Sequence, residues 1–286
     1  MTLSAPRPPA AHGPALSPRV LRTASLVLAS IALSAPAAAT PSFDPDLPEA
    51  VFEGADPHLV DGEGLPTWDR VERLHDGDAL FRQEDFAPGS AWIDDSPLSP
   101  HAAALFGDPT PHSGSSLLHM APGWLSTEHP VPILLVSGAS TSASGVLAVL
   151  ARQLAARGRS VFALSFAHPH GDCFQQAEQV ANALERIEHL TGAPQVDVIA
   201  HSKGGIAASV YLANRDGADW GPHPRAAAYT ARATRYRGDV RRFVPVAVPF
   251  GGLDTPFRWT APHLAVVNDD ADPVAPLPWQ TWYPMG

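Results

Sequence analysis

The residues best suited to covalent chemistry gather in one short stretch, Ala200-His201-Ser202-Lys203-Gly204. An apolar run at 196–199 precedes this stretch, and residues 206–214 behind it have the pattern of a helix. A small residue two before a serine and a glycine two after it permit a sharp strand-to-helix turn. Such a turn holds the hydroxyl clear of the sheet, at a helix N-terminus that favours a developing negative charge. The pattern therefore predicts a nucleophile, Ser202, and the alternative is an ordinary connection with a chance serine.

A nucleophilic serine needs a histidine base, and the base needs a carboxylate to orient it. In a parallel sheet these groups lie where strands end at their carboxyl side. Residues 263–267 read as a strand and Asp272 follows it, so we expect Asp272 to be the acid. Asp269 and Asp270 compete for this role, and a solvated acidic turn without function is the alternative.

Acyl transfer through a serine also needs two backbone N–H groups that stabilise the oxyanion. One is expected from Lys203, the residue after the nucleophile. The other is expected from Ala139, because Ser137-Gly138-Ala139 follows a strong apolar run and Gly138 permits a tight turn. The alternative is a small-residue connection with no function.

These groups must be held by a regular framework, and the chain alternates between two patterns after residue 130. Apolar β runs alternate with stretches of helical spacing, which indicates an α/β fold whose mostly parallel sheet carries helices on both faces. The expected strands are 131–136, 160–166, 196–199, 243–248 and 263–267, and the expected helices are 146–156, 178–190, 206–214 and 225–236.

The first 39 residues have the features of an export signal. Arg19 and Arg22 precede a short apolar run, 24–33, and Ala37-Ala38-Ala39 offers a cleavage site. The run is too short to span a bilayer. We therefore expect a secreted protein, extracellular or periplasmic, cleaved near Ala39 and without a transmembrane segment. A disordered Ala/Pro tail is the alternative.

Residues 40–127 have no clear periodicity. Asp, Pro, Gly and Ser are scattered through them, but Trp68, Trp92 and Trp124 are too many large apolar residues for a disordered linker. We expect an irregular extension packed on the core, able to supply edge strands, with a short helix at 69–80. Residues 128–286 then form the core.

Composition excludes some classes of partner and chemistry. The formal charge of the 286-residue chain is −10 and no cluster of Lys or Arg is present, which argues against a nucleic-acid partner. The single Cys173 cannot form an intrachain disulfide, and we expect it to be a packed side chain.

Four segments together resemble the class 2 bacterial lipases, small secreted α/β-hydrolases. They are 132–138, 191–192, 196–205 and 271–274. The resemblance implies an α/β-hydrolase fold and hydrolysis of carboxylic esters, with Ser202 as nucleophile and Asp272 as triad acid. It also implies oxyanion donors at Ala139 and Lys203, no cofactor, a lipid or small-molecule ester substrate, and transient contact with a lipid interface.

The chain departs from this family in three places. Ser137 stands where the family usually has histidine, and Lys203 where it often has a hydrophobic residue. No histidine follows Asp272, although the triad base should do so. Either the chain is truncated before its last strand and helix, or another histidine serves, or the fold has lost catalysis and binds a ligand. The histidines available for this role are His263, His223, His168 and His170.

The remaining hypotheses concern the loop after the second core strand and the residue before the nucleophile. His168, His170 and Asp172 could bind a metal by ligand type, but a substrate-contacting or surface loop is favoured and no metal is predicted. His201 is expected to be a hydrogen-bonded structural residue pointing away from Ser202. Other substrates that the same chemistry allows are polyesters, thioesters, or an acyl acceptor other than water.

Overall fold

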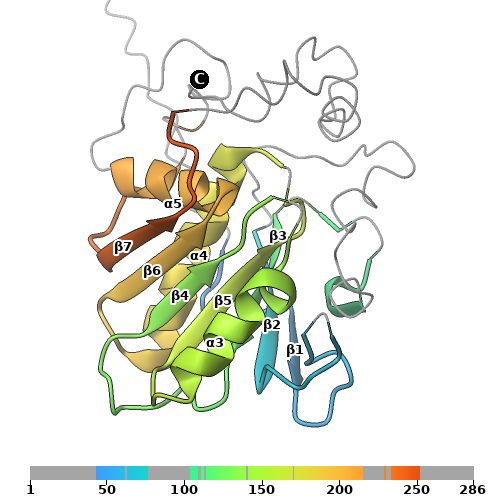
Figure 1. The fold of residues 1–286 in the computed structure, drawn as a ribbon. Coiled ribbons are helices and arrows are strands. Elements are labelled where there is room, and N and C mark those ends of the chain that lie inside the picture. Colours follow the sequence, from blue (N-terminus) through green and yellow to red (C-terminus); the bar gives the residue numbers. More distant parts are fainter. Residues whose placement is uncertain are drawn as a thin grey trace, which may run out of the picture. The chain divides into compact units, whose positions relative to one another are not determined.

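The apolar runs of the sequence form strands of one mixed sheet (Figure 1). In the computed structural model, the described residues are 43–61, 63–76, 104–108, 111–112, 114–139, 141–169, 171–214, 229 and 233–251. Within them the sheet has seven strands in the order β1-β2-β3-β5-β4-β6-β7. The strands are β1 (Ala50–Glu53), β2 (Arg70–His75), β3 (Ser115–Met120), β4 (Ile133–Val136), β5 (Val161–Phe166), β6 (Val196–His201) and β7 (Val240–Val246).

Strands β5, β4, β6 and β7 run parallel, because helical crossovers connect them. A short π-helix, η1 (Ala143–Leu147), and α3 (Ala148–Ala155) join β4 to β5. Helix α4 (Cys173–Thr191) joins β5 to β6, and α5 (Lys203–Ala213) follows β6. The carboxyl ends of these parallel strands lie along the same edge of the sheet, where the catalytic residues were expected.

The two faces of the sheet have separate cores, because successive side chains along a strand alternate between them. Leu134 and Val136 of β4 pack in one cluster with α4 and α5. Ile133 and Leu135 pack in the other cluster with α3. Figure 1 shows α3 on one face and α4 and α5 on the other. The α/β-hydrolase fold with helices on both faces, predicted from the sequence, is confirmed.

The stretch expected to be irregular supplies three antiparallel strands. β1 pairs with β2, β2 with β3, and β3 with β5, all antiparallel. The expected short helix at 69–80 is wrong, because Arg70–His75 is strand β2. The sequence of β2 does not alternate between buried apolar and exposed polar residues, because Val71 and Glu72 are both buried. The strand could therefore not be recognised from its pattern.

A buried ion pair explains Glu72 and fastens β2 to the α4 side of the sheet. Its carboxylate accepts two hydrogen bonds from Arg186 of α4, with Nε–Oε2 2.7 Å and Nη2–Oε1 2.9 Å. Arg70 donates to the same carboxylate at 2.8 Å. On the α3 side, Arg152 donates to Asp61 and, at 2.8 Å, to the Thr67 hydroxyl. The segment is therefore attached to helices on both faces.

Helix α4 starts earlier than the sequence suggested. Asp172 is its N-cap, and its carboxylate accepts from the N–H groups of Phe174 at 2.7 Å and Gln175 at 3.3 Å. The helix ends at Thr191, close to the predicted end at 190, and its C-cap Gly192 has a φ of 68°, in the left-handed region that favours glycine.

Several predicted features fall outside the described residues. They are the export signal, the strand at 263–267 and Asp272 with its neighbouring aspartates. Of the helix expected at 225–236, Tyr229 is helical and residues 233–236 are not. None of the described helices is long and apolar enough to cross a bilayer.

Candidate active site

Ser202 occupies the turn between β6 and α5 in a strained backbone conformation. Its φ of 51° and ψ of −128° lie where a residue with a Cβ is disfavoured. Its N–H donates to the Val246 carbonyl of β7 at 2.9 Å, and its carbonyl accepts from Gly205 at 3.0 Å. The tight strand-to-helix turn predicted from the sequence is therefore present and is tied to the neighbouring strand.

Two glycines after Ser202 are required by close contacts. A Cβ on Gly204 would lie 2.0 Å from the Ser137 carbonyl oxygen, at the end of β4. A Cβ on Gly205 would lie 2.1 Å from Val248 Cγ2. Because the first obstacle is backbone, no rotamer change can relieve it, and this turn can form only with glycine at 204.

Gly138 allows the loop after β4 to pack against the Ser202 turn. A Cβ at this position would lie 2.9 Å from Ser202 Cβ and 3.0 Å from the His201 carbonyl oxygen. Gly138 does not have a positive φ. It is needed for close approach rather than for an unusual turn, and the residue after it is Ala139.

Lys203 opens α5, so its N–H is among the first helical N–H groups, which have no intrahelical acceptor. Its side chain is buried, an outcome that sequence reasoning missed. The ammonium donates to the Gly171 carbonyl and, at 2.6 Å, to Gln176 Oε1. Lys203 therefore links the Ser202 turn to the start of α4. The family often has a hydrophobic residue at the position of Lys203. The one signal available was that this is the only lysine in the chain.

His168 is built into the packing of the loop after β5. It is buried, and its Nε2 lies 2.5 Å from the Pro111 carbonyl oxygen. Its own carbonyl accepts from Gln176 Nε2 at 2.7 Å. Its predicted role as a substrate contact stays a prediction, and His170 lies outside the described residues.

His201 and Cys173 lie, respectively, beside Ser202 in the chain and in the packing of α4, and neither has a nucleophilic role. The Nδ1 atom of His201 is buried and has no hydrogen-bond partner among the described residues, so the expected hydrogen bond is wrong for this atom. It would lie 3.1 Å from a Cβ on Gly138. Burial raises the pKa of the Cys173 thiol, which keeps it protonated, as expected of a packed side chain.

The base and the acid of the predicted triad are not found in this part of the chain. Within the described ranges, no histidine or carboxylate hydrogen-bonds to the Ser202 hydroxyl. Asp272, His263 and His223 lie outside those ranges. Nor do three His, Cys, Asp or Glu side chains gather there as metal ligands would.

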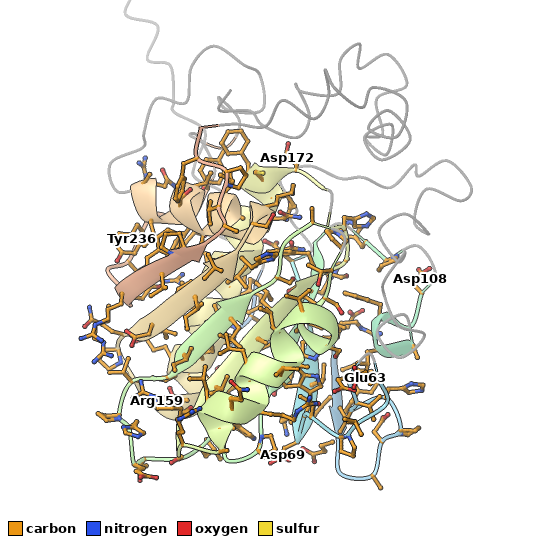
Figure 2. All side chains as sticks on the ribbon, in the orientation of Figure 1. Glu63, Asp69, Asp108, Arg159, Asp172 and Tyr236 are labelled. Carbon is orange, nitrogen blue, oxygen red and sulfur yellow. The ribbon has the colours of Figure 1, made fainter. Side chains whose placement is uncertain are left out.

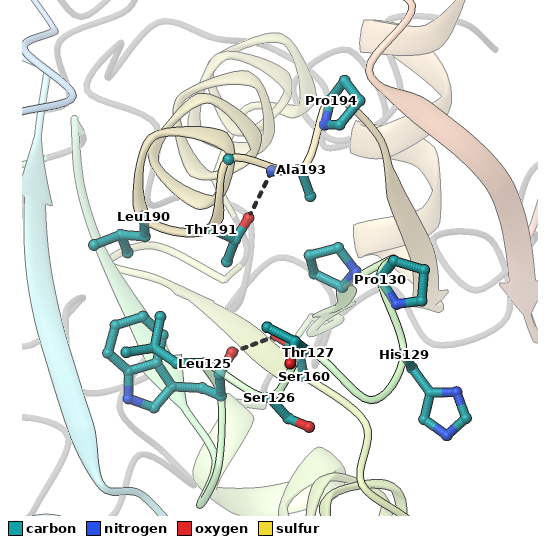
Figure 3. A pocket seen from close by; sticks show the side chains of 13 residues that line it. Leu125, Ser126, Thr127, His129, Pro130, Ser160, Leu190, Thr191, Ala193 and Pro194 are labelled. Atoms are coloured by element: carbon teal, nitrogen blue, oxygen red, sulfur yellow. Dashed lines mark hydrogen bonds between the residues drawn. The ribbon is translucent and has the colours of Figure 1, made fainter.

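A separate cavity lies at the opposite end of the sheet (Figure 3). It has a volume of about 480 Å³, and its lining includes Pro132, Ser160 and Pro194, which directly precede or lie near the starts of β4, β5 and β6. One of the hydroxyls that line it, that of Thr191, accepts a hydrogen bond from the Ala193 N–H at 3.2 Å. Figure 2 shows the two ends of the sheet, with Asp172, the N-cap of α4, at one end and Asp69 and Arg159 at the other. This cavity therefore lies away from the candidate chemistry.

Residues 130–219 match the family model described as Lipase (class 2). The matched range contains β4, the Gly138 loop, α4 and the whole strand–turn–helix around Ser202. The resemblance predicted from the sequence is confirmed over this range. The match suggests an ester hydrolase, and the family implies lipid esters as substrates.

Proposed function

We propose that the chain is a secreted serine hydrolase that cleaves carboxylic esters through an acyl-enzyme on Ser202. The observation that carries this proposal is the strained Ser202 turn, held between β6 and α5 with Gly138 packed against it. A serine held at positive φ is a cost that a merely structural connection does not need. A lipid ester is the substrate class that the family match favours.

In this mechanism, the Ser202 hydroxyl attacks the ester carbonyl carbon and gives its proton to a histidine. The negative charge moves to the carbonyl oxygen, which accepts hydrogen bonds from the N–H groups of Ala139 and Lys203. Collapse of this intermediate expels the alcohol, protonated by the same histidine, and leaves the acyl group on Ser202. A water molecule, activated by the histidine, then releases the carboxylic acid.

Asp272 is our proposed acid. The histidine that acts as the base is to be identified by experiment. His168 is a poor candidate, because its Nε2 faces the Pro111 carbonyl. Replacement of His263, His223 and His170 by alanine, one at a time, should identify the base by a loss as large as that of Ser202→Ala. If none does so while Ser202-dependent turnover persists, the base comes from elsewhere.

The central test combines labelling and turnover. A fluorophosphonate probe should label Ser202, and Ser202→Ala should abolish labelling and reduce p-nitrophenyl ester turnover on the order of 10⁴-fold. Ser209→Ala is a matched control in the same helix, since the Ser209 hydroxyl bonds only the Ile206 carbonyl at 2.8 Å. Labelling that survives Ser202→Ala would remove the assignment. Specific ligand binding without any turnover would favour the inactive binding protein instead.

Export is a separate part of the proposal. The basic flank, short apolar run and Ala37-Ala38-Ala39 site support cleavage near Ala39. N-terminal sequencing of protein recovered outside the cytoplasm should begin at or near Thr40. An intact Met1 on the exported protein would rule out cleavage.

A further inference from the structure

The start of η1 is held by side chains from two strands and from the segment before β2. The indole Nε1–H of Trp68 donates to Ser144 Oγ at 2.9 Å. The N–H of Ala143 donates to Ser165 Oγ at 2.8 Å. His119 Nε2 lies 3.0 Å from the same Ser165 oxygen, and the Trp68 and His119 rings are 4.9 Å apart. None of these five residues is more than 4 % exposed, so each bond is shielded from water.

Ser165 can satisfy both of its partners at once. A hydroxyl carries one donor and two acceptor lone pairs, so it can accept from Ala143 and, according to the His119 tautomer, donate to or accept from Nε2. Burial lowers the pKa of His119 to about 3, which leaves the imidazole neutral and able to accept. The network therefore works without a charged group and keeps its form across the ordinary pH range.

This network lies at one end of the loop that carries Ala139. At the other end, the Ser137 N–H and hydroxyl both donate to the Leu164 carbonyl, at 3.3 and 2.9 Å. Leu164 and Ser165 are consecutive residues of β5, so one strand holds both ends of the loop. Gly138, between them, packs against Ser202. Little freedom remains for the backbone beside the nucleophile.

We infer that Trp68, His119 and Ser165 are positioning residues that fix the Ala139 N–H relative to Ser202. The inference rests on the proposed function, because it assigns these residues to the oxyanion hole of that reaction. A donor that drifts by about 1 Å loses much of its effect on the transition state. The segment that the family match does not cover is thereby given a part in catalysis.

The sharpest test removes the indole bond from each side. Trp68→Phe keeps an aromatic ring and deletes the donor, and Ser144→Ala deletes the acceptor. Each should lower kcat about tenfold with KM within twofold, the size expected for one buried hydrogen bond. The double variant should be no worse than either single one, because both remove the same interaction. Inhibition by a trifluoromethyl ketone, whose Ser202 adduct carries the oxyanion, should weaken in parallel.

Trp124→Phe is the matched control, because Trp124 packs on Phe162 with ring centroids 5.8 Å apart, near the opposite end of the sheet. It should leave kcat and ketone inhibition unchanged even if it lowers the melting temperature. Additive losses in the double variant, or a rise in KM with kcat unchanged, would overturn the inference.

Amide hydrogen exchange supplies a readout that does not need turnover. Ser165→Ala should speed exchange across residues 143–147 about tenfold, since Ala143 loses its acceptor. Unchanged exchange would overturn the inference that Ser165 holds the start of η1. An inactive wild-type protein would instead remove the proposed function and the catalytic role of these residues, while exchange still decides whether Trp68, His119 and Ser165 hold η1.

Discussion

The two flanks of the sheet are held in different ways. The N-terminal flank, β1–β3, buries Glu72 against Arg186 and is fastened to helices on both faces. The C-terminal flank, β7, has β6 as its one strand partner among the described residues. Its Val244 and Val246 are 44 % and 43 % exposed, and its Arg241, 36 % exposed, pairs with the buried Asp197 of β6.

This difference separates the parts of the proposed site. In our inference, β3 and the segment before β2 support the Ala139 side of Ser202, where a donor must be held to a fraction of an ångström. Strand β7 instead precedes, in the sequence, the segment that contains Asp272. In the described ranges, the Ser202 turn and the expected oxyanion segments come together, and Asp272 lies outside those ranges.

The largest expected effect breaks the N-terminal flank at its buried ion pair. Glu72→Ala leaves the Arg186 guanidinium, 5 % exposed, without its carboxylate, and should lower the free energy of unfolding by about 3–5 kcal/mol. Urea denaturation monitored by circular dichroism would measure this. Glu53→Ala is the control, since Glu53 pairs with Arg70 at 2.6 Å in an exposed site and should matter far less. Equal losses in the two variants would contradict the comparison.

A second prediction concerns the tie between α4 and the segment before β7. Burial raises the pKa of Glu178 to about 7, partly offset by hydrogen bonds from Thr234 at 3.1 and 2.8 Å; Asp76 raises it further, whereas Arg237 lowers it. The folded state therefore binds the proton more tightly than the unfolded state. The contribution of protonated Glu178 to the free energy of unfolding is fully present below about pH 4.5. It is lost as the pH rises through 7, by at most about 3 kcal/mol.

Unfolding free energies at pH 5, 6, 7 and 8 test the Glu178 assignment. Wild-type stability should fall across this range by more than that of Glu178→Gln, which cannot titrate there. Parallel pH profiles for the two proteins would show that Glu178 does not carry the dependence.

A third prediction compares one substitution on both flanks. Val71→Thr places a hydroxyl in the fully buried position of β2 and should cost about 1–3 kcal/mol. Val246→Thr on β7 keeps the β-branch at an exposed position and should change stability by less than about 0.5 kcal/mol. Chemical denaturation of both variants measures the contrast. A comparable loss in Val246→Thr would mean that β7 is covered in solution.

The smallest effect is expected at the pair between the exposed Arg241 of β7 and Asp197 of β6. Arg241 donates to both oxygens of Asp197, at 2.8 and 2.5 Å, but its side chain is 36 % exposed. Arg241→Ala should lower the melting temperature slightly in low salt, and the difference should shrink in high salt because the exposed guanidinium is screened. A loss of the same size in low and high salt would count against this.

The local features of the chain were predictable from the sequence. The strands and helices between residues 130 and 214, and the Ser202 turn, follow from periodicity and from small residues within a few positions of the serine. The predicted start of α4 was too late, because the cap at Asp172 precedes a first turn with little apolar periodicity. The mistaken helix at 69–80 has a different cause, since the burial of Glu72 depends on a distant arginine.

The sequence by itself therefore determined the fold class and the place of the candidate nucleophile, because both depend on near neighbours in the chain. Only the tertiary structure decided which polar groups are buried and what they hold. Glu72 meets Arg186 across 114 residues, and Trp68 meets Ser144 across 76. The Lys203 ammonium finds its acceptors only where α4 begins beside α5. Residue types at such separations carry no local pattern, so their pairing appears only when the sheet has brought the segments together.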